Sequence, residues 1–204
     1  MQLMYAPGTC AIGIHIVLEE IGKPYELVKV DFANRAQYGA EFTARNPKSK
    51  VPVLVRDDGS VLTEYQAISV WLGLTNPQAK LIPPDAEGHA RMLECMDYVV
   101  GTMHGQAWRG AMRMVQITPE EAAHPAIQKR GEEMFTRGMG ILNDRLAGKD
   151  WVVGDFSLAD PALFFVSWWR VERMKTPLPA NVAAHYERML ARPAVQRALK
   201  MEGF

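Results

Sequence analysis

Strand and helix patterns alternate along roughly the first 75 residues, and this order limits the possible folds more than any other feature. A short apolar stretch ends at a Pro-Gly turn, and from Cys10 onward apolar residues recur at the three- and four-residue steps of a helix. Further elements are expected at 25–32, 41–45, 51–55, 60–62 and 67–74. The predicted order is β-α-β-α-β-β-α.

Strand patterns fade after residue 84, and helix patterns replace them. The segment 76–84 is rich in proline and polar residues, as linkers often are. A further helix is expected to begin near residue 157, and its segment 163–169 is apolar nearly all round, which predicts a helix at the centre of the bundle. We expect an α/β plus all-α chain. The α/β domain would span 1–78, the linker 79–87 and the all-helical domain 88–204.

Composition argues against several classes of function. The chain has 23 basic and 23 acidic residues, a net charge of zero and no run of like charge, so neither nucleic acid nor a membrane surface is expected as a partner. No signal peptide or membrane-spanning stretch is visible. The two cysteines lie in different contexts and predict no disulfide. We expect a soluble cytoplasmic protein without a metal, since no His/Cys/Asp cluster has ligand spacing.

Cys10 lies where a strand and a turn give way to a helix. A helix N-terminus carries partial positive charge and unpaired N–H groups, which stabilise a thiolate of the protein or of a ligand beside it. Because no second cysteine follows at C-x-x-C spacing, the expected partner is an external thiol, and glutathione is the abundant candidate. The alternative is a small buried residue at a helix start. Cys95, in an apolar helical pattern, is expected in the core.

Two further segments could bind a peptide-like ligand. Pro52 opens a strand after a long connection, where cis peptide bonds are frequent, and Val51 would then turn its N–H and C=O toward a ligand. A capping box over 63–66 would place Glu64 and Tyr65 in the first turn of a helix, where N–H groups bind carboxylates and Glu64 could pair with an ammonium. The plainer alternatives are an ordinary edge strand and an acidic residue at a helix start.

Three isolated side chains complete the candidates. Arg35, which can bind in a bidentate manner, and Lys50 could hold another carboxylate, unless both are solvated surface charges. His104 stands near the expected end of a long helix, before Gly105, and could donate a hydrogen bond to a sulfur or a carboxylate. The alternative for His104 is a purely structural role.

Together these motifs resemble the glutathione transferase family, and most of all its bacterial beta class, over almost the whole chain. Four motifs carry the resemblance and occur in order. They are the N-terminal segment 5–10, which ends in Cys10, the segment 46–54, which leads to and includes Pro52, the segment 62–64 before the third helix, and the helix start with its capping box at 155–160. The resemblance implies a thioredoxin-like N-terminal domain, an all-helical C-terminal domain and a homodimer.

The resemblance also implies a position for glutathione. The peptide would lie along Val51 and Pro52, with its sulfur near Cys10 and its γ-glutamyl end at Glu64 and Tyr65. Tyr65 stands where the class commonly has a serine, so its bulk could narrow the site.

Other positions match residues of the class. Arg35 matches a basic glutathione contact, and Lys50 is assigned to glutathione with it. His104 matches a histidine near the thiol, and Asp97 a polar residue that can reach the glutathione of a partner subunit. Ala11 replaces a common serine beside Cys10.

The expected activity is conjugation of glutathione to a hydrophobic electrophile, or thiol–disulfide exchange through Cys10, with His104 as a second catalytic residue. The residues expected to line the electrophile site are Tyr5, Trp108, Met112 and Trp169. Two alternatives remain open. One is a thiol–disulfide reductase with glutathione as the resolving thiol, and the other is a non-enzymatic binding protein.

Overall fold

The computed structural model describes residues 1–204, which divide into two compact units. Met1–Ile82 and Met189–Phe204 form the first unit, and Pro83–Arg188 form the second. None of the helices combines the length and the apolar character that crossing a bilayer demands.

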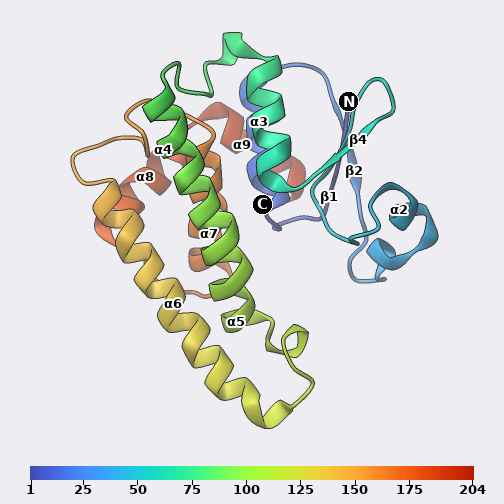
Figure 1. The fold of residues 1–204 in the computed structure, drawn as a ribbon, viewed down its shortest axis with the longest axis vertical. Coiled ribbons are helices and arrows are strands. Elements are labelled where there is room, and N and C mark those ends of the chain that lie inside the picture. The colour runs from blue at the N-terminus through green and yellow to red at the C-terminus, as the bar shows by residue number, and fades with distance from the viewer. The chain divides into compact units, whose positions relative to one another are not determined.

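The first unit contains a four-stranded sheet with the strand order β2-β1-β3-β4. β1 pairs parallel with β2 and antiparallel with β3, and β3 pairs antiparallel with β4. The predicted order of strands and helices is confirmed (Figure 1). The elements are β1 (Gln2–Tyr5), α1 (Ala11–Ile21), β2 (Glu26–Lys29), η1 (Ala36–Tyr38), α2 (Ala40–Arg45), β3 (Val53–Val55), β4 (Val61–Thr63), α3 (Tyr65–Thr75), η2 (Pro77–Ala79) and α9 (Pro193–Glu202).

The core of the first unit forms around α1. Every residue from Ala11 to Leu18 is buried, which explains the nearly continuous apolar pattern of this helix. α1 packs on α3 and on β1, and Gly22 ends it in the left-handed conformation that glycine adopts most easily. The antiparallel pairing of β1 with β3 therefore places the end of β1, and the turn that leads from it into α1, beside β3.

The last helix packs with the first unit rather than the second. Three side-chain pairs join α1 to the end of the chain, namely Glu20 with Arg192, Glu19 with Arg197 and His15 with Glu202. The expected all-helical domain over 88–204 therefore differs from the compact units at its carboxyl end. Helical periodicity cannot tell which unit a short amphipathic helix packs on, because any apolar surface satisfies its apolar face.

The second unit is all-helical, as expected. Its elements are α4 (Ala86–Asp97), the π-helical stretch η3 (Tyr98–Trp108), α5 (Arg109–Met112), the short turns η4 (Met114–Gln116) and η5 (Glu121–Ala123), α6 (His124–Arg145), α7 (Ala159–Glu172) and α8 (Ala180–Leu190). α8 continues for two residues beyond Arg188, where the second unit ends. α4, η3 and α5 follow one another without a break, and α6 packs alongside η3 and α5 (Figure 1).

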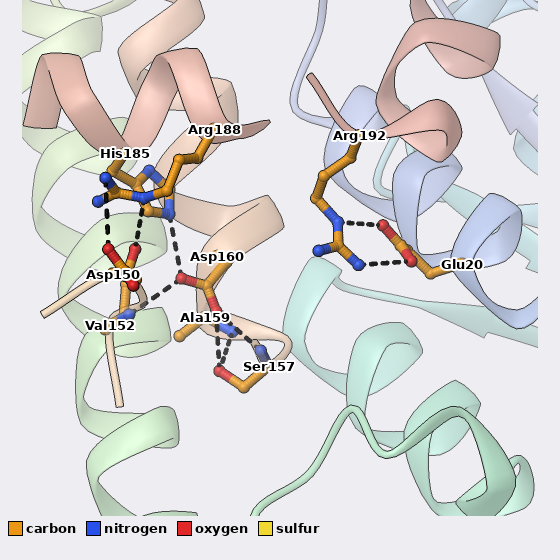
Figure 2. A network of polar contacts seen from close by, with 9 residues as sticks. All are labelled: Glu20, Asp150, Val152, Ser157, Ala159, Asp160, His185, Arg188 and Arg192. Atoms are coloured by element: carbon orange, nitrogen blue, oxygen red, sulfur yellow. Dashed lines mark hydrogen bonds and ion pairs between the residues drawn. The ribbon is translucent and has the colours of Figure 1, made fainter. Parts of the chain in front are cut away.

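A buried polar network holds the start of α7, which is buried nearly all round as its composition predicts. One oxygen of Asp160 accepts the Ser157 N–H at 2.8 Å, and the other accepts the Val152 N–H and faces Nε2 of His185, both at 3.0 Å (Figure 2). Asp160 and His185 are both inaccessible to solvent. The carboxylate thus satisfies backbone donors that would otherwise be buried without partners.

Candidate functional site

A tight turn carries Cys10 from β1 into α1. Gly8 has a φ of +67°, in the left-handed region where a side chain is unfavourable. The Thr9 hydroxyl donates to the carbonyl of Ala6 at 2.8 Å and accepts the Ala11 N–H at 3.3 Å. Cys10 is the N-cap of α1, as the sequence predicts, and is only 7% exposed.

The Cys10 thiol donates a hydrogen bond to the carbonyl of Val51 at 3.6 Å. Burial raises its pKa to about 12, and the negative charges of Glu64 and Glu202 add to the rise. A backbone hydrogen bond and the positive charge of Lys50 oppose it. Desolvation therefore outweighs the helix-start effect that favours a thiolate, and the thiol of the unliganded site is a neutral donor.

The backbone before β3 is arranged as the sequence predicts. The Val51–Pro52 peptide bond is cis. Asn46 fixes this connection, because its side-chain amide donates to the carbonyl of Lys50 at 2.7 Å. The Val51 carbonyl accepts the Cys10 thiol, whereas the Val51 N–H makes no hydrogen bond within the chain. One backbone donor beside Cys10 is thus available to a ligand.

The start of α3 differs from the predicted capping box over 63–66. The N-cap is Glu64, whose φ of +74° lies outside the helical region, so the first helical residue is Tyr65. The carbonyl of Glu64 accepts the Ile68 N–H at 3.0 Å, as an N-cap carbonyl does. The prediction that Glu64 lies inside the first turn is wrong, although its carboxylate still stands at the helix start.

The side chains at this helix start point in different ways. The Glu64 carboxylate is largely exposed and forms an ion pair with Lys48, whose Nζ also donates to the Thr63 hydroxyl at 2.6 Å. Tyr65 is 4% exposed, so its bulk is packed into the interior.

Arg35 and Lys50 occupy different surroundings. Arg35 is exposed, and its guanidinium carbon lies 5.1 Å from the centroid of the Tyr38 ring. No hydrogen bond or ion pair joins Arg35 to Cys10 or Glu64. Lys50 lies close enough to Cys10 for its charge to lower the pKa of the thiol. The structure therefore groups Lys50, but not Arg35, with the thiol.

An aromatic cluster in the second unit gathers three of the predicted residues. The ring of His104 meets Trp169 edge-on at 4.8 Å between centroids, and Trp108 stacks on Trp169 at 4.5 Å. His104 lies inside the continuous helical run that ends at Met112, so its predicted place near a helix end is wrong. The run continues past Gly105 as the π-helical η3. π-Helical segments within α-helices often occur at functional sites.

The other predicted residues lie at the ends of elements. Met112 is the last residue of α5, one turn after Trp108. Asp97 is the exposed last residue of α4. Tyr5 ends β1 in the first unit, buried, with its ring centroid 6.2 Å from that of His15. The structure contains no group of three His, Cys, Asp or Glu side chains that could hold a metal ion.

Sequence reasoning missed two residues of this region. Glu202 accepts the Gly8 N–H at 2.9 Å from the far end of the chain. An acidic residue so near the C-terminus gives no signal of burial, because only the packing of α9 covers it. Lys48 was missed as a partner of Glu64, although it belongs to the motif at 46–54 that leads to Pro52.

Comparison with known proteins agrees with this geometry. A model of the N-terminal domain of glutathione S-transferases matches residues 8–75. Glutathione S-transferase GstA of Escherichia coli O157:H7 is 32% identical over 207 residues, covering 100% of this chain and 99% of the relative. The chain belongs to the glutathione S-transferase family.

Solved structures place this glutathione S-transferase family member among bacterial relatives. A glutathione transferase homologue from Sulfitobacter, solved with bound glutathione, is 31% identical with a TM-score of 0.88, covering 99% of this chain and 97% of the other. The bacterial beta class glutathione S-transferase of Sphingomonas chungbukensis is 30% identical with a TM-score of 0.84, covering 100% and 99%. The family fold, a thioredoxin-like N-terminal sheet with helices and an all-helical part, is thus present.

Proposed function

We propose that the protein is a cytoplasmic glutathione transferase of the bacterial beta class, which binds glutathione in the first unit and holds its sulfur beside Cys10. The observation that carries the proposal is the contact between the Cys10 thiol and Val51, whose N–H remains available to a ligand. A neutral thiol donor next to a free backbone donor suits a peptide that bears its own thiol. The similarity to a beta class structure supports the class.

Glutathione would lie along Val51 and Pro52, with its γ-glutamyl end at the start of α3. There the exposed carboxylate of Glu64 can pair with the ligand ammonium in place of Lys48, and the N–H of Tyr65 can meet the carboxylate. Lys50 and Arg35 are assigned to the carboxylate at the other end of the peptide. Arg35 would have to leave its stacking contact with Tyr38 to reach it.

The proposed chemistry is attack of the glutathione thiolate on a hydrophobic electrophile, which forms a carbon–sulfur bond and releases a leaving group where the electrophile carries one. Cys10 would stabilise that thiolate by turning its single S–H hydrogen from the Val51 carbonyl to the glutathione sulfur. Trp108, Met112 and Trp169 in the second unit and Tyr5 in the first remain the proposed contacts of the electrophile. His104 remains the second proposed catalytic residue. In a homodimer, Asp97 would reach the glutathione of the partner subunit.

The test is intact-mass measurement after incubation with glutathione disulfide, together with conjugation assays. Exchange would leave one glutathionyl group on Cys10 and release one molecule of glutathione. We expect conjugation to fall in Cys10→Ala, and any mass gain to disappear in that variant. Cys95→Ala is the matched control, because this second thiol is buried in the helical unit and should leave both readouts unchanged.

Other outcomes would point to the alternatives. Conjugation that survives in Cys10→Ala while exchange is lost would show that the Cys10 thiol serves only disulfide exchange and is not needed for conjugation. Failure of glutathione to bind at millimolar concentration would contradict both enzymatic functions and leave a binding protein with this fold.

A further inference from the structure

A buried carboxylate from the last helix reaches the turn that carries Cys10. Oε2 of Glu202 accepts the Gly8 N–H at 2.9 Å, and Oε1 lies 3.2 Å from Nδ1 of His15. The side chains of both Glu202 and His15 are completely inaccessible to solvent. Gly8 is 194 residues away from Glu202 in the sequence and lies two residues before Cys10.

We propose that Glu202 is a positioning residue for the Cys10 thiol. Glu202 holds the turn that carries Cys10 through the Gly8 N–H, and its carboxylate disfavours a second negative charge on the Cys10 sulfur. This inference rests on the proposed role of Cys10 in the glutathione site. It adds a residue at the other end of the chain to that site and assigns the carboxylate a function beyond anchoring α9.

The positioning part follows from the geometry of the turn. A buried backbone N–H needs an acceptor, and the Gly8 N–H finds one in the Glu202 carboxylate. A charged acceptor makes a shorter and stronger bond than a neutral one. The hydrogen bonds of the Thr9 side chain at the turn are local, so the orientation of the turn relative to the rest of the unit depends on longer-range contacts, which include those of Gly8 with Glu202 and of Cys10 with Val51.

The electrostatic part follows from burial. A charge in a low-dielectric interior acts over longer distances than one in water. The groups that act on the Cys10 thiol are Glu202 on α9 and Glu64 before α3, which raise its pKa, and Lys50 before β3, which lowers it. Glu202 also raises the pKa of Tyr5 on β1 and of Tyr25.

His15 provides the second contact of the Glu202 carboxylate. Its Nδ1 faces Oε1 and can donate to it, while Nε2 is buried without a hydrogen-bond partner. The carboxylate thus lies between two N–H donors, one from His15 and one from Gly8.

A comparison within the chain separates this role from simple anchoring. Glu20 also joins α1 to the end of the chain, through a bidentate pair with Arg192 at 2.6 and 2.9 Å (Figure 2). Glu20 does not touch the Cys10 turn and is not among the groups that shift the thiol. Glu20→Gln is therefore a matched control that weakens the attachment of the last helix alone.

The experiment follows alkylation of Cys10 by iodoacetamide as a function of pH, in the full-length protein without glutathione. Peptide mapping separates Cys10 from Cys95. We expect Glu202→Gln to lower the midpoint of the pH profile by about half a unit to one unit, which is about a 3- to 10-fold faster reaction at a fixed pH below the midpoint. Glu20→Gln should keep the midpoint of the wild type. Equal midpoints in all three proteins would overturn the proposal.

A further variant distinguishes charge from loosening of the turn. Glu202→Asp keeps the charge but shortens the reach to Gly8. The midpoint of the alkylation profile should therefore stay high, while the alkylation rate of Cys10 at the high-pH plateau rises. If Glu202→Gln does not fold, the Glu202→Asp profile decides, because a plateau rate equal to that of the wild type contradicts the positioning role. A loss of glutathione binding would contradict the proposed function but would leave the midpoints untouched.

Discussion

The thiol of Cys10 and the carbonyl of Val51 meet at 3.6 Å although 41 residues separate them in the chain. The antiparallel pairing of β1 with β3, in which Met4 lies opposite Val53, brings the two segments together. Burial keeps the thiol protonated, and in that form it donates to the Val51 carbonyl. It also joins the two sequence motifs that carry the proposed glutathione site.

Alkaline pH should destabilise the protein through Cys10. Its pKa is raised to about 12 in the folded state, so the unfolded thiol loses its proton first. The stabilisation is intact below about pH 8.5 and is lost as the pH rises toward the folded value, by up to about 1.4 kcal/mol per unit. Urea unfolding above about pH 9 should show a shallower fall in Cys10→Ala than in the wild type. Parallel falls would contradict this, since Cys95 remains in both proteins.

Removal of either proposed charge contact should weaken glutathione binding. We expect Glu64→Gln and Arg35→Ala each to raise the dissociation constant about 3- to 10-fold, because each removes one charge-assisted contact with the ligand. Isothermal titration calorimetry measures the change. Glu26→Gln and Arg45→Ala are controls of matching charge on exposed positions of β2 and α2. Unchanged affinity in both test variants would refute the proposed position of glutathione.

Asp160→Ala should strongly destabilise the second unit. The substitution leaves two buried backbone donors and His185 without their acceptor, and breaking such a buried pair costs about 3–5 kcal/mol. Thermal or urea unfolding should show the loss. Asp150→Ala is the control, because this carboxylate pairs with Arg188 at the surface and is 75% exposed (Figure 2). A similar effect of the two substitutions would show that burial is not the cause.

Two glycines of α6 should respond in opposite directions to substitution by alanine. A Cβ on Gly131 would lie 2.1 Å from the backbone nitrogen of Ala111, so the helices must separate at a cost of about 3 kcal/mol or more. A Cβ on Gly140 meets nothing within 4 Å, and alanine there should stabilise the helix by about 0.5–1 kcal/mol. Melting temperatures of the two variants measure both effects. A stable Gly131→Ala variant would contradict the close helix crossing.

The order of elements in the first unit could be predicted because the signals are local. Apolar periodicity marks α1, Pro-Gly and Asp-Gly pairs mark turns, and the proline at position 52 marks the start of a strand. The N-cap of α3 lies one residue after the one that the predicted capping box implies, since a glutamate at a φ of +74° is held by surrounding structure rather than by its own preference.

The amino-acid sequence by itself determined the succession of strands and helices, the helix-start position of Cys10 and the family resemblance, because each depends on residues near one another in the chain. Only the tertiary structure decided the charge state of the thiol, the interior packing of Tyr65 and the reach of Glu202 to Gly8. Desolvation and charge act through space, so their effect on Cys10 depends on which distant segments cover it. The thiol that local sequence marks as activated is therefore buried as a neutral donor.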